Sequence, residues 1–282
     1  MYDEKEFHIS TSQPYLVLGT GKFYQHILAS LGISHFYSFH GNLEKNIDVP
    51  FLADGCSNII FAYKENPNQN EELEMKSFLI DSTVQQQILT IEKNTDYFCV
   101  RFQPGENPCF RGLTVKEFAG KKIDLAEFEG MQPLIQKMQK EQSFSSRMCC
   151  FMDEYRKFFN QRISAQHQLY KQIINLIAEK KGLLKITELE VLTGYSARYI
   201  NHIFENQSGM SAKQFCNIIK MQCILQDLND GNVSSFHKLA ADYKFYDQAH
   251  FIHEFKGYTG KTPSGYLNEV GNYKYKKAVI GI

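Results

Sequence analysis

The last hundred residues of the chain contain an internal repeat, and this repeat constrains the fold more than any other feature. Six positions recur in the same order at an offset of about fifty, with one residue gained in the second copy. The first copy has Leu189, Tyr195, Ile200, His202, Phe204 and Gly209, and the second has Leu239, Phe245, Phe251, His253, Phe255 and Gly260. Each copy has the pattern of a short helix, a turn and a second helix. Two helix-turn-helix units fit two grooves of DNA better than they fit an active site.

Local start and stop signals delimit the helices of the first unit. Thr187 and Glu190 have the spacing of a capping box, which predicts that the first helix begins there. Gly194 closes this helix, because glycine adopts a left-handed conformation without steric cost. Ser196 is the predicted N-cap of the second helix, which runs to about Asn206 and has an apolar inner face.

The same kinds of signal delimit the connecting helix and the second unit. Ser211 and Gln214 form another capping-box pair, which opens a long helix that joins the two units and ends at Asn229-Asp230-Gly231. Asp247 is the predicted N-cap of the second helix of the second unit. Thr262-Pro263 starts a closing helix, because proline suits the first helical position.

These segments resemble the DNA-binding domain of AraC/XylS-type bacterial transcription regulators over roughly residues 166 to 270. In that family a connecting helix holds two helix-turn-helix units, so that their second helices enter successive major grooves on one side of the duplex. The resemblance rests on Gly194-Tyr195-Ser196, Arg198-Tyr199-Ile200-Asn201, Gly209-Met210-Ser211, Phe245-Tyr246-Asp247-Gln248-Ala249-His250-Phe251 and Thr259-Gly260-Lys261-Thr262-Pro263-Ser264-Gly265-Tyr266.

The resemblance also implies which side chains contact DNA. Arginine can bind guanine through two hydrogen bonds, Asn and Gln can pair with adenine, and a small Ala can meet a thymine methyl group. By position, the implied base contacts come from Arg198, Asn201, His202, Gln248, Ala249 and His253. The candidates for phosphate contacts lie at helix starts or outer faces, with solvated surface lysine as the alternative, and are Lys213, Lys256 and Lys261.

Two features depart from the family pattern. His202 and His253 stand in a region where the family is usually basic, so positive charge is lost from both second helices. Lys244 stands where the second unit normally has glycine, so this turn uses either a strained backbone angle or a different turn type. The favoured interpretation is neutral drift in a competent domain. The alternative is that both helices depend on the protonation state of imidazole.

Charge and length divide the chain into two parts. From Ala165 onward, Lys and Arg number 14 against 10 Asp and Glu, whereas residues 1 to 164 have 17 against 21. This modest positive excess predicts weak DNA binding that falls as salt rises, and dimerisation would strengthen it. A chain of 282 residues with 43% hydrophobic residues fits two domains.

Targeting and cysteine patterns indicate a cytoplasmic protein. No stretch approaches about twenty uninterrupted apolar residues, and the N-terminal residues lack the pattern of a signal peptide. The seven Cys include no Cys-x-x-Cys spacing, so reduced thiols are expected.

The first 125 residues have the composition of short strands. Runs rich in aromatic and β-branched residues, broken by Gly, Pro, Asn and Asp, span residues 15–18, 35–39, 59–63, 77–80, 87–91 and 97–102. One helix is predicted over Lys22 to Leu31, where apolar residues have helical spacing. A mostly antiparallel sheet that curls on itself would bury these strands without open edges.

Two short segments of this half, Asp54 to Phe61 and Val100 to Gly105, resemble the cupin-like barrel that forms the sensor in one branch of the same regulators. This looser resemblance implies a regulatory domain that binds a small molecule, contributes to a dimer, or both. The effector-binding residues are not identifiable from the sequence.

Other residues of the N-terminal half give no positive sign of a cofactor. His8, His26, His35 and His40 include no His-x-His pair, so no metal or other cofactor is expected. Arg101 is predicted to pair with a neighbouring Asp or Glu, with an anionic ligand as the alternative. Gly19-Thr20-Gly21-Lys22 lacks the remainder of a phosphate-binding loop and is predicted to be a turn before the helix.

The predicted fold class is α+β with two domains. Residues 1–130 form a mostly antiparallel, cupin-like β-barrel with flanking helices, and residues 166–282 form the all-α domain with two helix-turn-helix units. Between them, residues 131–165 form amphipathic helices with a break at Ser143 to Ser146, followed by a linker near Asn160 to Gln166. Their aromatic stripe is expected to pack on the barrel, or alternatively on its twin in a second subunit.

The sequence therefore predicts a regulator that binds double-stranded promoter DNA and is controlled by a small molecule or partner at its N-terminal domain. The resemblance implies contact with RNA polymerase, and a homodimer is a further possible assembly. One alternative is a barrel enzyme fused to a DNA-binding domain, although no catalytic residues are identifiable and an enzyme is not expected. Another is a degenerate family member that acts through protein contacts. The effector, the operator and the direction of regulation stay open.

Overall fold

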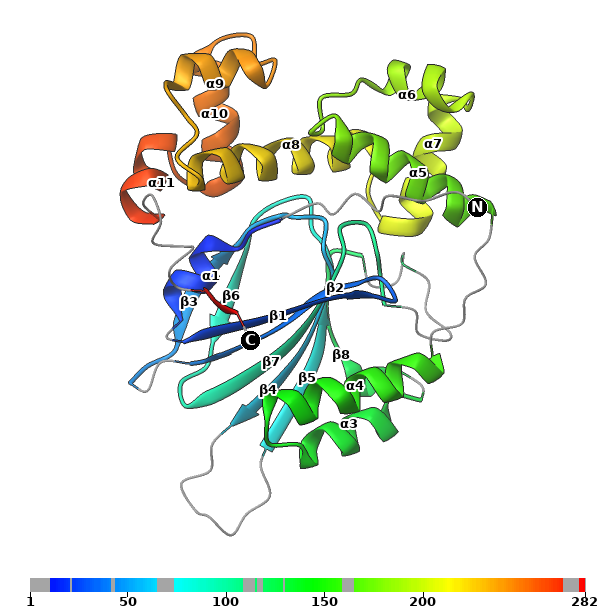
Figure 1. Cartoon of the computed structure of the whole chain (residues 1–282), viewed down its shortest axis with the longest axis vertical. Helices are drawn as coiled ribbons and strands as arrows, with labels where there is room; N and C mark the ends of the chain where they lie inside the picture. The colour runs from blue at the N-terminus through cyan, green and yellow to red at the C-terminus, as the bar shows by residue number, and fades with distance from the viewer. Residues whose placement is uncertain are drawn as a thin grey trace.

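The computed structural model of the chain has a β-rich part and a helical part (Figure 1). It describes residues 11–20, 22–41, 44–64, 74–108, 115, 119–128, 130–158, 165–270 and 279–281, so His8 and most of the predicted linker lie outside the described residues. The β-rich part comes from the first half of the chain and one strand at residues 279–281, and helices alone make up residues 165–270. The predicted α+β fold with two domains is confirmed.

Six strands of the N-terminal domain and β9, which follows the C-terminal helices in the sequence, form one sheet in the order β8-β5-β4-β7-β2-β1-β9. Neighbouring strands are antiparallel except β1 and β9, which are parallel. β3 and β6 form a separate antiparallel pair. The bounds are β1 (Phe23–Ser30), β2 (Ile33–His40), β3 (Ile47–Phe51), β4 (Asn58–Lys64), β5 (Glu74–Ile80), β6 (Gln87–Ile91), β7 (Thr95–Phe102), β8 (Lys122–Asp124) and β9 (Val279–Gly281).

The large sheet supports a core on each face, because successive side chains of a strand point to opposite sides. Tyr37 and Tyr97 face an interior that β3 and β6 help to enclose, and Phe36 and Phe98 face the helices that follow the sheet. The two sheets share this interior but are not joined by a described strand pairing, so the barrel is not closed by hydrogen bonds.

The predicted amphipathic helices after the sheet are α3 (Gln132–Lys140) and α4 (Phe144–Phe158), separated by a short break. Phe151 and Tyr155 on α4 are fully buried. Their rings lie 6.0 Å from Phe36 and 5.7 Å from Phe102, respectively, centroid to centroid. The aromatic stripe therefore packs on the chain's own sheet, as the first of the two interpretations predicts.

Two predictions near the N-terminus are wrong. Residues 15–18 lie in a helix, α1 (Pro14–Gly19), and the segment Lys22 to Leu31 contains strand β1. Proline at the start favours α1. In β1 the helical spacing is overridden by pairing with β2 through a turn at Leu31-Gly32, where φ is 55° and 77°. The turn after Gly19 therefore precedes a strand.

The C-terminal domain is built around α8, which lies between two small cores. Phe215 and Ile219 belong to the core shared with α5 and α7, whereas Ile224 and Leu225 belong to the core shared with α9, α10 and α11. The bounds are α5 (Ala165–Glu179), α6 (Ile186–Thr193), α7 (Ala197–Ser208), α8 (Ala212–Asn229), α9 (Phe236–Asp242), α10 (Gln248–Thr259) and α11 (Pro263–Val270). Within the described residues, no helix has both the length and the apolar character needed to cross a membrane.

The predicted capping box of Thr187 with Glu190 is wrong. α6 begins one residue before Thr187, and the carboxylate of Glu188 accepts a hydrogen bond from the amide of Lys185 at 2.6 Å. The Glu190 carboxylate instead accepts from the amide of Ala197 at 2.6 Å. Since Ala197 is the first residue of α7, Glu190 ties the two helices of the first unit together.

Candidate nucleic-acid interface

The first helix-turn-helix unit consists of α6, a short turn and α7. Gly194 ends α6 with φ 74°, a left-handed conformation that glycine adopts easily. The hydroxyl of Ser196 accepts from the amide of Tyr199 at 3.4 Å and caps α7, as predicted. Ile200 and Phe204 are fully buried and fix the inner face of α7.

The second unit consists of α9, a turn and α10, and it repeats this frame with different residues. Lys244 has φ 54°, so the predicted strained backbone angle is confirmed. The carboxylate of Asp247 accepts from the amide of His250 at 2.7 Å and caps α10. Phe251 and Phe255 are fully buried. Each unit therefore presents a capped second helix, and we call α7 and α10 the recognition helices.

Both recognition helices end against the N-terminal domain. The carbonyl of Gln207 near the end of α7 accepts from the side-chain amide of Asn107 at 2.6 Å, and the carbonyl of Thr259 at the end of α10 accepts from the hydroxyl of Tyr15 at 3.5 Å. Figure 1 shows α6 and α9 on the side of α8 that is remote from the sheet, so the starts of the recognition helices also lie away from the N-terminal domain.

The structure places five of the six predicted base-contacting side chains at the surface. The sixth, Asn201, is half-buried, and its side-chain oxygen accepts from the amide of Ala212 at the start of α8 at 3.2 Å. A ring nitrogen of His202 lies 3.0 Å from the side-chain amide of Asn206 one turn later. The exposed five are Arg198, His202, Gln248, Ala249 and His253.

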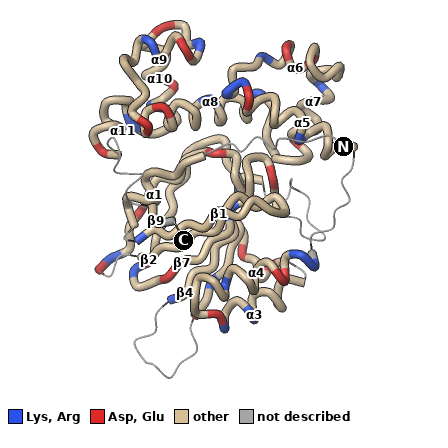
Figure 2. The backbone as a smooth tube through the Cα atoms, viewed as in Figure 1, with Lys and Arg blue, Asp and Glu red and all other residues tan. Residues whose placement is uncertain are grey.

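The predicted phosphate-contacting lysines have different surroundings. Lys213, in the first turn of α8, and Lys256, in the last turn of α10, are exposed. Lys261 is half-buried, pairs with the carboxylate of Glu269, and lies 5.6 Å from the ring centre of Tyr15. Figure 2 shows Lys and Arg interspersed with Asp and Glu over the helical domain.

Tyr246 is a surface residue that sequence reasoning missed. It is 92% exposed and directly precedes Asp247, the N-cap of α10. Gly194 and Lys244 are the matching left-handed residues of the two turns. The N-cap Ser196 follows Gly194 by two residues, whereas the N-cap Asp247 follows Lys244 by three. The residue gained in the second copy of the repeat therefore lies in this turn. The change in the repeat offset was the sequence signal that could have identified Tyr246.

A polar cluster joins the N-terminal domain to α8 and α10. The side chain of Gln222 on α8 accepts from the amide of Ser12 at 2.8 Å and donates to the carbonyl of Ala53 at 3.2 Å. The hydroxyl of Tyr258 on α10 also donates to the carbonyl of Ala53. Because Gln222 is 1% exposed, these bonds form inside the interface and are shielded from water.

Arg101 lies beside this cluster and is paired internally. Its guanidinium is 2.5 Å from the carboxylate of Asp54, and both side chains are buried, so the favoured prediction of a neighbouring acidic partner is confirmed. Burial, followed by the charge of Arg101, lowers the pKa of His35 to about 3, which keeps this imidazole neutral. Among the described residues, no group of three His, Cys, Asp or Glu side chains could hold a metal ion.

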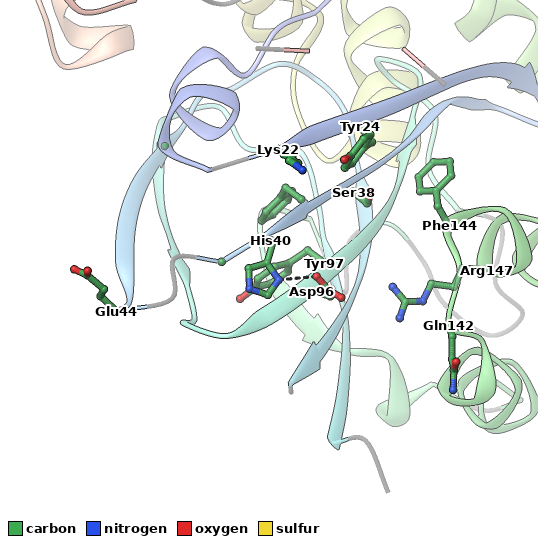
Figure 3. A pocket seen from close by; sticks show the side chains of 13 residues that line it. Lys22, Tyr24, Ser38, His40, Glu44, Asp96, Tyr97, Gln142, Phe144 and Arg147 are labelled. Atoms are coloured by element: carbon green, nitrogen blue, oxygen red, sulfur yellow. Dashed lines mark hydrogen bonds and ion pairs between the residues drawn. The ribbon is translucent and has the colours of Figure 1, made fainter. Parts of the chain in front are cut away.

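A cavity of about 890 Å³ lies where the helix-facing side of the sheet meets the start of α4 (Figure 3). This volume is within the usual range of small-molecule sites. His40 and Asp96 form a pair at 2.7 Å on one wall. The lining residues are Gly19, Lys22, Tyr24, Ser38, Phe39, His40, Gly41, Glu44, Asp96, Tyr97, Gln142, Phe144 and Arg147.

Comparisons with known proteins match each domain separately. Residues 191–269 match a family described as a helix-turn-helix domain, and residues 28–124 match a domain family of unknown function, DUF6597. XylDLEGF operon transcriptional activators 1 and 3 of Pseudomonas putida are 28% and 27% identical to this chain over 101 residues, which is 35% of the chain. The match spans 30% of the length of each relative.

A solved structure of ToxT from Vibrio cholerae aligns with 88% of this chain and 98% of that chain, at 11% identity and a TM-score of 0.42. A likeness at this level supports no functional conclusion. The repeated units on α8 and the matched segment define a DNA-binding domain with two helix-turn-helix units. Over this segment the chain is similar to AraC/XylS-type regulators, and the similarity covers the C-terminal domain alone.

Proposed function

We propose that the chain regulates transcription by binding specific promoter sequences with its C-terminal domain, under control of its N-terminal domain. The observation that carries this proposal is the repeat itself, in which α8 holds two capped recognition helices with polar, exposed outer faces. Such helices enter the major groove with the residues near their N-termini against the bases. The identity to two operon activators over 101 residues supports the same function.

The proposed base contacts come from the exposed faces of α7 and α10. Arg198 lies in the first turn of α7 and has the geometry to bind guanine, while Gln248 at the start of α10 can pair with adenine. His202, Ala249 and His253 complete the two faces. We assign Asn201 a positioning role, because its side chain already accepts from the start of α8.

The proposed phosphate contacts are those of Lys213 and Lys256, which are exposed. Lys261 is a weaker candidate, because contact with DNA would compete with its pairing to Glu269. With an excess of only four positive charges from residue 165 onward, 14 Lys and Arg against 10 Asp and Glu, counterion release from one chain is small. We therefore propose a homodimer on DNA, which doubles the number of contacts.

Control by the N-terminal domain is proposed to act through the ends of the recognition helices. Asn107 and Tyr15 bind the carbonyls near the ends of α7 and α10, and the cluster around Gln222 holds α8. A small-molecule effector in the N-terminal domain would change DNA binding only by favouring one arrangement of these contacts over another. The cavity beside α4 is the proposed effector site.

RNA polymerase is a further proposed partner. Val191 and Leu192 on α6 are 85% and 55% exposed, and they form an apolar surface outside the recognition helices. Burial of these side chains against a partner protein would remove apolar area from water. Charged substitutions at both positions should reduce activation in a transcription assay and leave DNA affinity unchanged.

Recovery of genomic fragments bound by the full chain, followed by gel shifts across a salt series, tests the proposed function. We expect a shared motif with two half-sites about one helical turn apart, and affinity for it that falls as salt rises. Binding that shows no sequence preference even at low salt would instead support a family member that acts through protein contacts.

A further inference from the structure

Two buried arginines in the N-terminal domain differ in whether they have a carboxylate partner. Arg101 is 3% exposed and pairs with Asp54 at 2.5 Å. Arg147 is 7% exposed, yet no carboxylate among the described residues lies within ion-pair distance of its guanidinium. Burial removes the hydration of a charge, and without a counter-ion at ion-pair distance this loss is only partly compensated. The environment of Arg147 therefore suits the binding of an anion from outside the chain.

The guanidinium of Arg147 is held firmly on one face and one edge. Its Nε atom donates to the carbonyl of Glu141 at 3.0 Å, and its Cζ atom lies 3.6 Å above the ring centre of Tyr63. The Tyr63 hydroxyl in turn donates to the carbonyl of Met138 at 3.0 Å. These contacts fix the plane of the guanidinium through the C-terminal end of α3. An arginine held in this way loses little further freedom when it binds a ligand.

The terminal nitrogens of Arg147 point into the cavity, as Figure 3 shows. Asp96 lies across the cavity, but its carboxylate is bound to His40 at 2.7 Å. Glu44 lies at the far margin, with its carboxylate directed away from Arg147. Lys22 lines the same cavity as a second cation and is exposed. Asp96 and Glu141 partly oppose the effect of burial on the charge of Arg147, but neither carboxylate lies within ion-pair distance of its guanidinium.

The rest of the wall suits an apolar, flat body. Tyr24 and Phe144 line the cavity, and Phe39 and Tyr97 border it from the core on the other face of the sheet. Phe144 is braced by an edge-to-face contact with Phe98, at 5.5 Å between ring centres. Aromatic side chains bury large areas and pack well against other rings, and ligand sites typically combine such walls with a few fixed polar groups.

We propose that this cavity binds a small carboxylic acid with an aromatic or similarly flat apolar body, whose carboxylate binds Arg147. The planar guanidinium matches a carboxylate in geometry and can donate two parallel hydrogen bonds to it. Burial lowers the pKa of Arg147 from its ordinary value, and a bound anion would oppose that shift. The inference rests on the proposed function, because it names the ligand class of the proposed effector site.

The first test compares three probes of the same shape on the unmodified full chain. Isothermal titration with 3-phenylpropanoate, 3-phenylpropanamide and 3-phenylpropylamine varies the charge of the head group and keeps the aromatic body. We expect heat of binding from the carboxylate alone. Equal binding of all three probes, preference for the amine, or no binding of the carboxylate at millimolar concentration would overturn the proposal.

The second test changes the arginine. Arg147→Gln should weaken carboxylate binding by about 10- to 100-fold, because one charge-assisted hydrogen-bond pair is lost. Arg147→Lys should bind with intermediate affinity, since it keeps the charge and loses the planar fork. The matched control is Arg156→Gln on the same helix, where the side chain is 63% exposed and outside the cavity lining. This control should bind like the original chain.

Thermal unfolding of each variant without ligand separates loss of the site from loss of the fold. If Arg147→Gln keeps its unfolding midpoint and still binds the carboxylate with unchanged affinity, the assignment of Arg147 is wrong. Calorimetry requires no DNA, so a failure of the ligand proposal is distinguishable from a failure of sequence-specific DNA binding, which the fragment recovery tests separately.

Discussion

The two helix-turn-helix units share one frame and differ at the turn. Gly194 and Lys244 occupy the same left-handed position, with φ 74° and 54°. The second unit then has one more residue, Tyr246, before its N-cap. Because lysine disfavours this conformation, the packing of α9 against α10 must impose it. The comparison teaches that buried positions and caps fix the frame, whereas the turn surface is free to vary.

The units also differ in how the recognition helix meets the helix that follows it. In the first unit Asn201 accepts from the amide of Ala212 and so holds the start of α8. In the second unit the next helix, α11, is held by its own Thr262, whose hydroxyl accepts from the amide of Gly265 at 3.2 Å. The first recognition helix is therefore tied to the next helix by a side-chain hydrogen bond, whereas the second packs on the next helix through Phe255 and Tyr266, whose ring centres lie 5.6 Å apart.

The largest expected effect comes from truncating the matched core residues of the two units. Phe251→Ala should destabilise the fold by about 3–5 kcal/mol and Ile200→Ala by about 2–5 kcal/mol, because each leaves a cavity at a fully buried position. Phe251 should cost more, since its ring contacts those of Phe245 and Phe255 at 5.3 and 5.7 Å. Urea unfolding followed by circular dichroism measures both, with the exposed Lys238→Ala as control. Equal small losses would show that the shared frame does not depend on these positions.

Next in size is the effect of the proposed reading residues on DNA. Arg198→Ala should cost about 1–3 kcal/mol of binding free energy at one or two base positions and relax the preference there. Lys256→Ala should weaken all sequences alike and reduce the salt slope by about one unit. Gel shifts on a panel of single-base operator variants distinguish the two. Uniform loss on every sequence for Arg198→Ala would show that Arg198 does not read bases.

The two N-caps provide a smaller and more symmetrical test. Ser196→Ala and Asp247→Ala should each destabilise the chain by about 1 kcal/mol, because each leaves an amide at the start of a recognition helix without its partner. Asp247→Ala should be the costlier change, since its carboxylate also interacts favourably with the helix dipole. Urea unfolding at low salt provides the measurement. A loss confined to one unit would contradict equivalent capping.

The smallest expected effect concerns the turn itself, and its sign differs between the units. Gly194→Ala should destabilise the chain by about 1 kcal/mol through backbone strain alone, because nothing lies within 4 Å of the added methyl group. Lys244→Gly should stabilise it by about 0.5–1 kcal/mol, since relief of strain exceeds the added entropy of the unfolded chain. Shifts in the thermal midpoint show the signs. Destabilisation by Lys244→Gly would mean that the lysine side chain stabilises the turn.

The C-terminal helices were largely predictable because their signals are local. Ser196, Ser211 and Asp247 cap the helices that follow them, and each cap is recognisable from a few neighbouring residues. The prediction for the start of α6 chose the wrong glutamate of two that are close in sequence. Glu188, rather than Glu190, accepts a hydrogen bond from the backbone at the helix start. Local chemistry predicts that a helix exists more firmly than it predicts the first residue of that helix.

The N-terminal domain was less predictable because strands depend on distant partners. The segment from Phe23 to Ser30 has helical spacing but pairs along its length with β2. The sequence does not show which of Arg101 and Arg147 has an acidic partner. The fold places Asp54 beside Arg101. The candidate ligand site could not be predicted, because its cavity is formed by strands and helices from separate parts of the chain.

By itself, the sequence determined the class of the protein. Repeated apolar positions, caps and turns specify two helix-turn-helix units, since a helix is stabilised by contacts between residues that are close along the chain. Only the tertiary structure decided which polar groups are satisfied internally and which are left to face a cavity. Asn201 and Lys261 are engaged within the chain, and Arg147 is buried with no carboxylate of the described residues at ion-pair distance. Such differences arise from long-range packing, because burial and counter-charge depend on what the rest of the fold brings near each side chain.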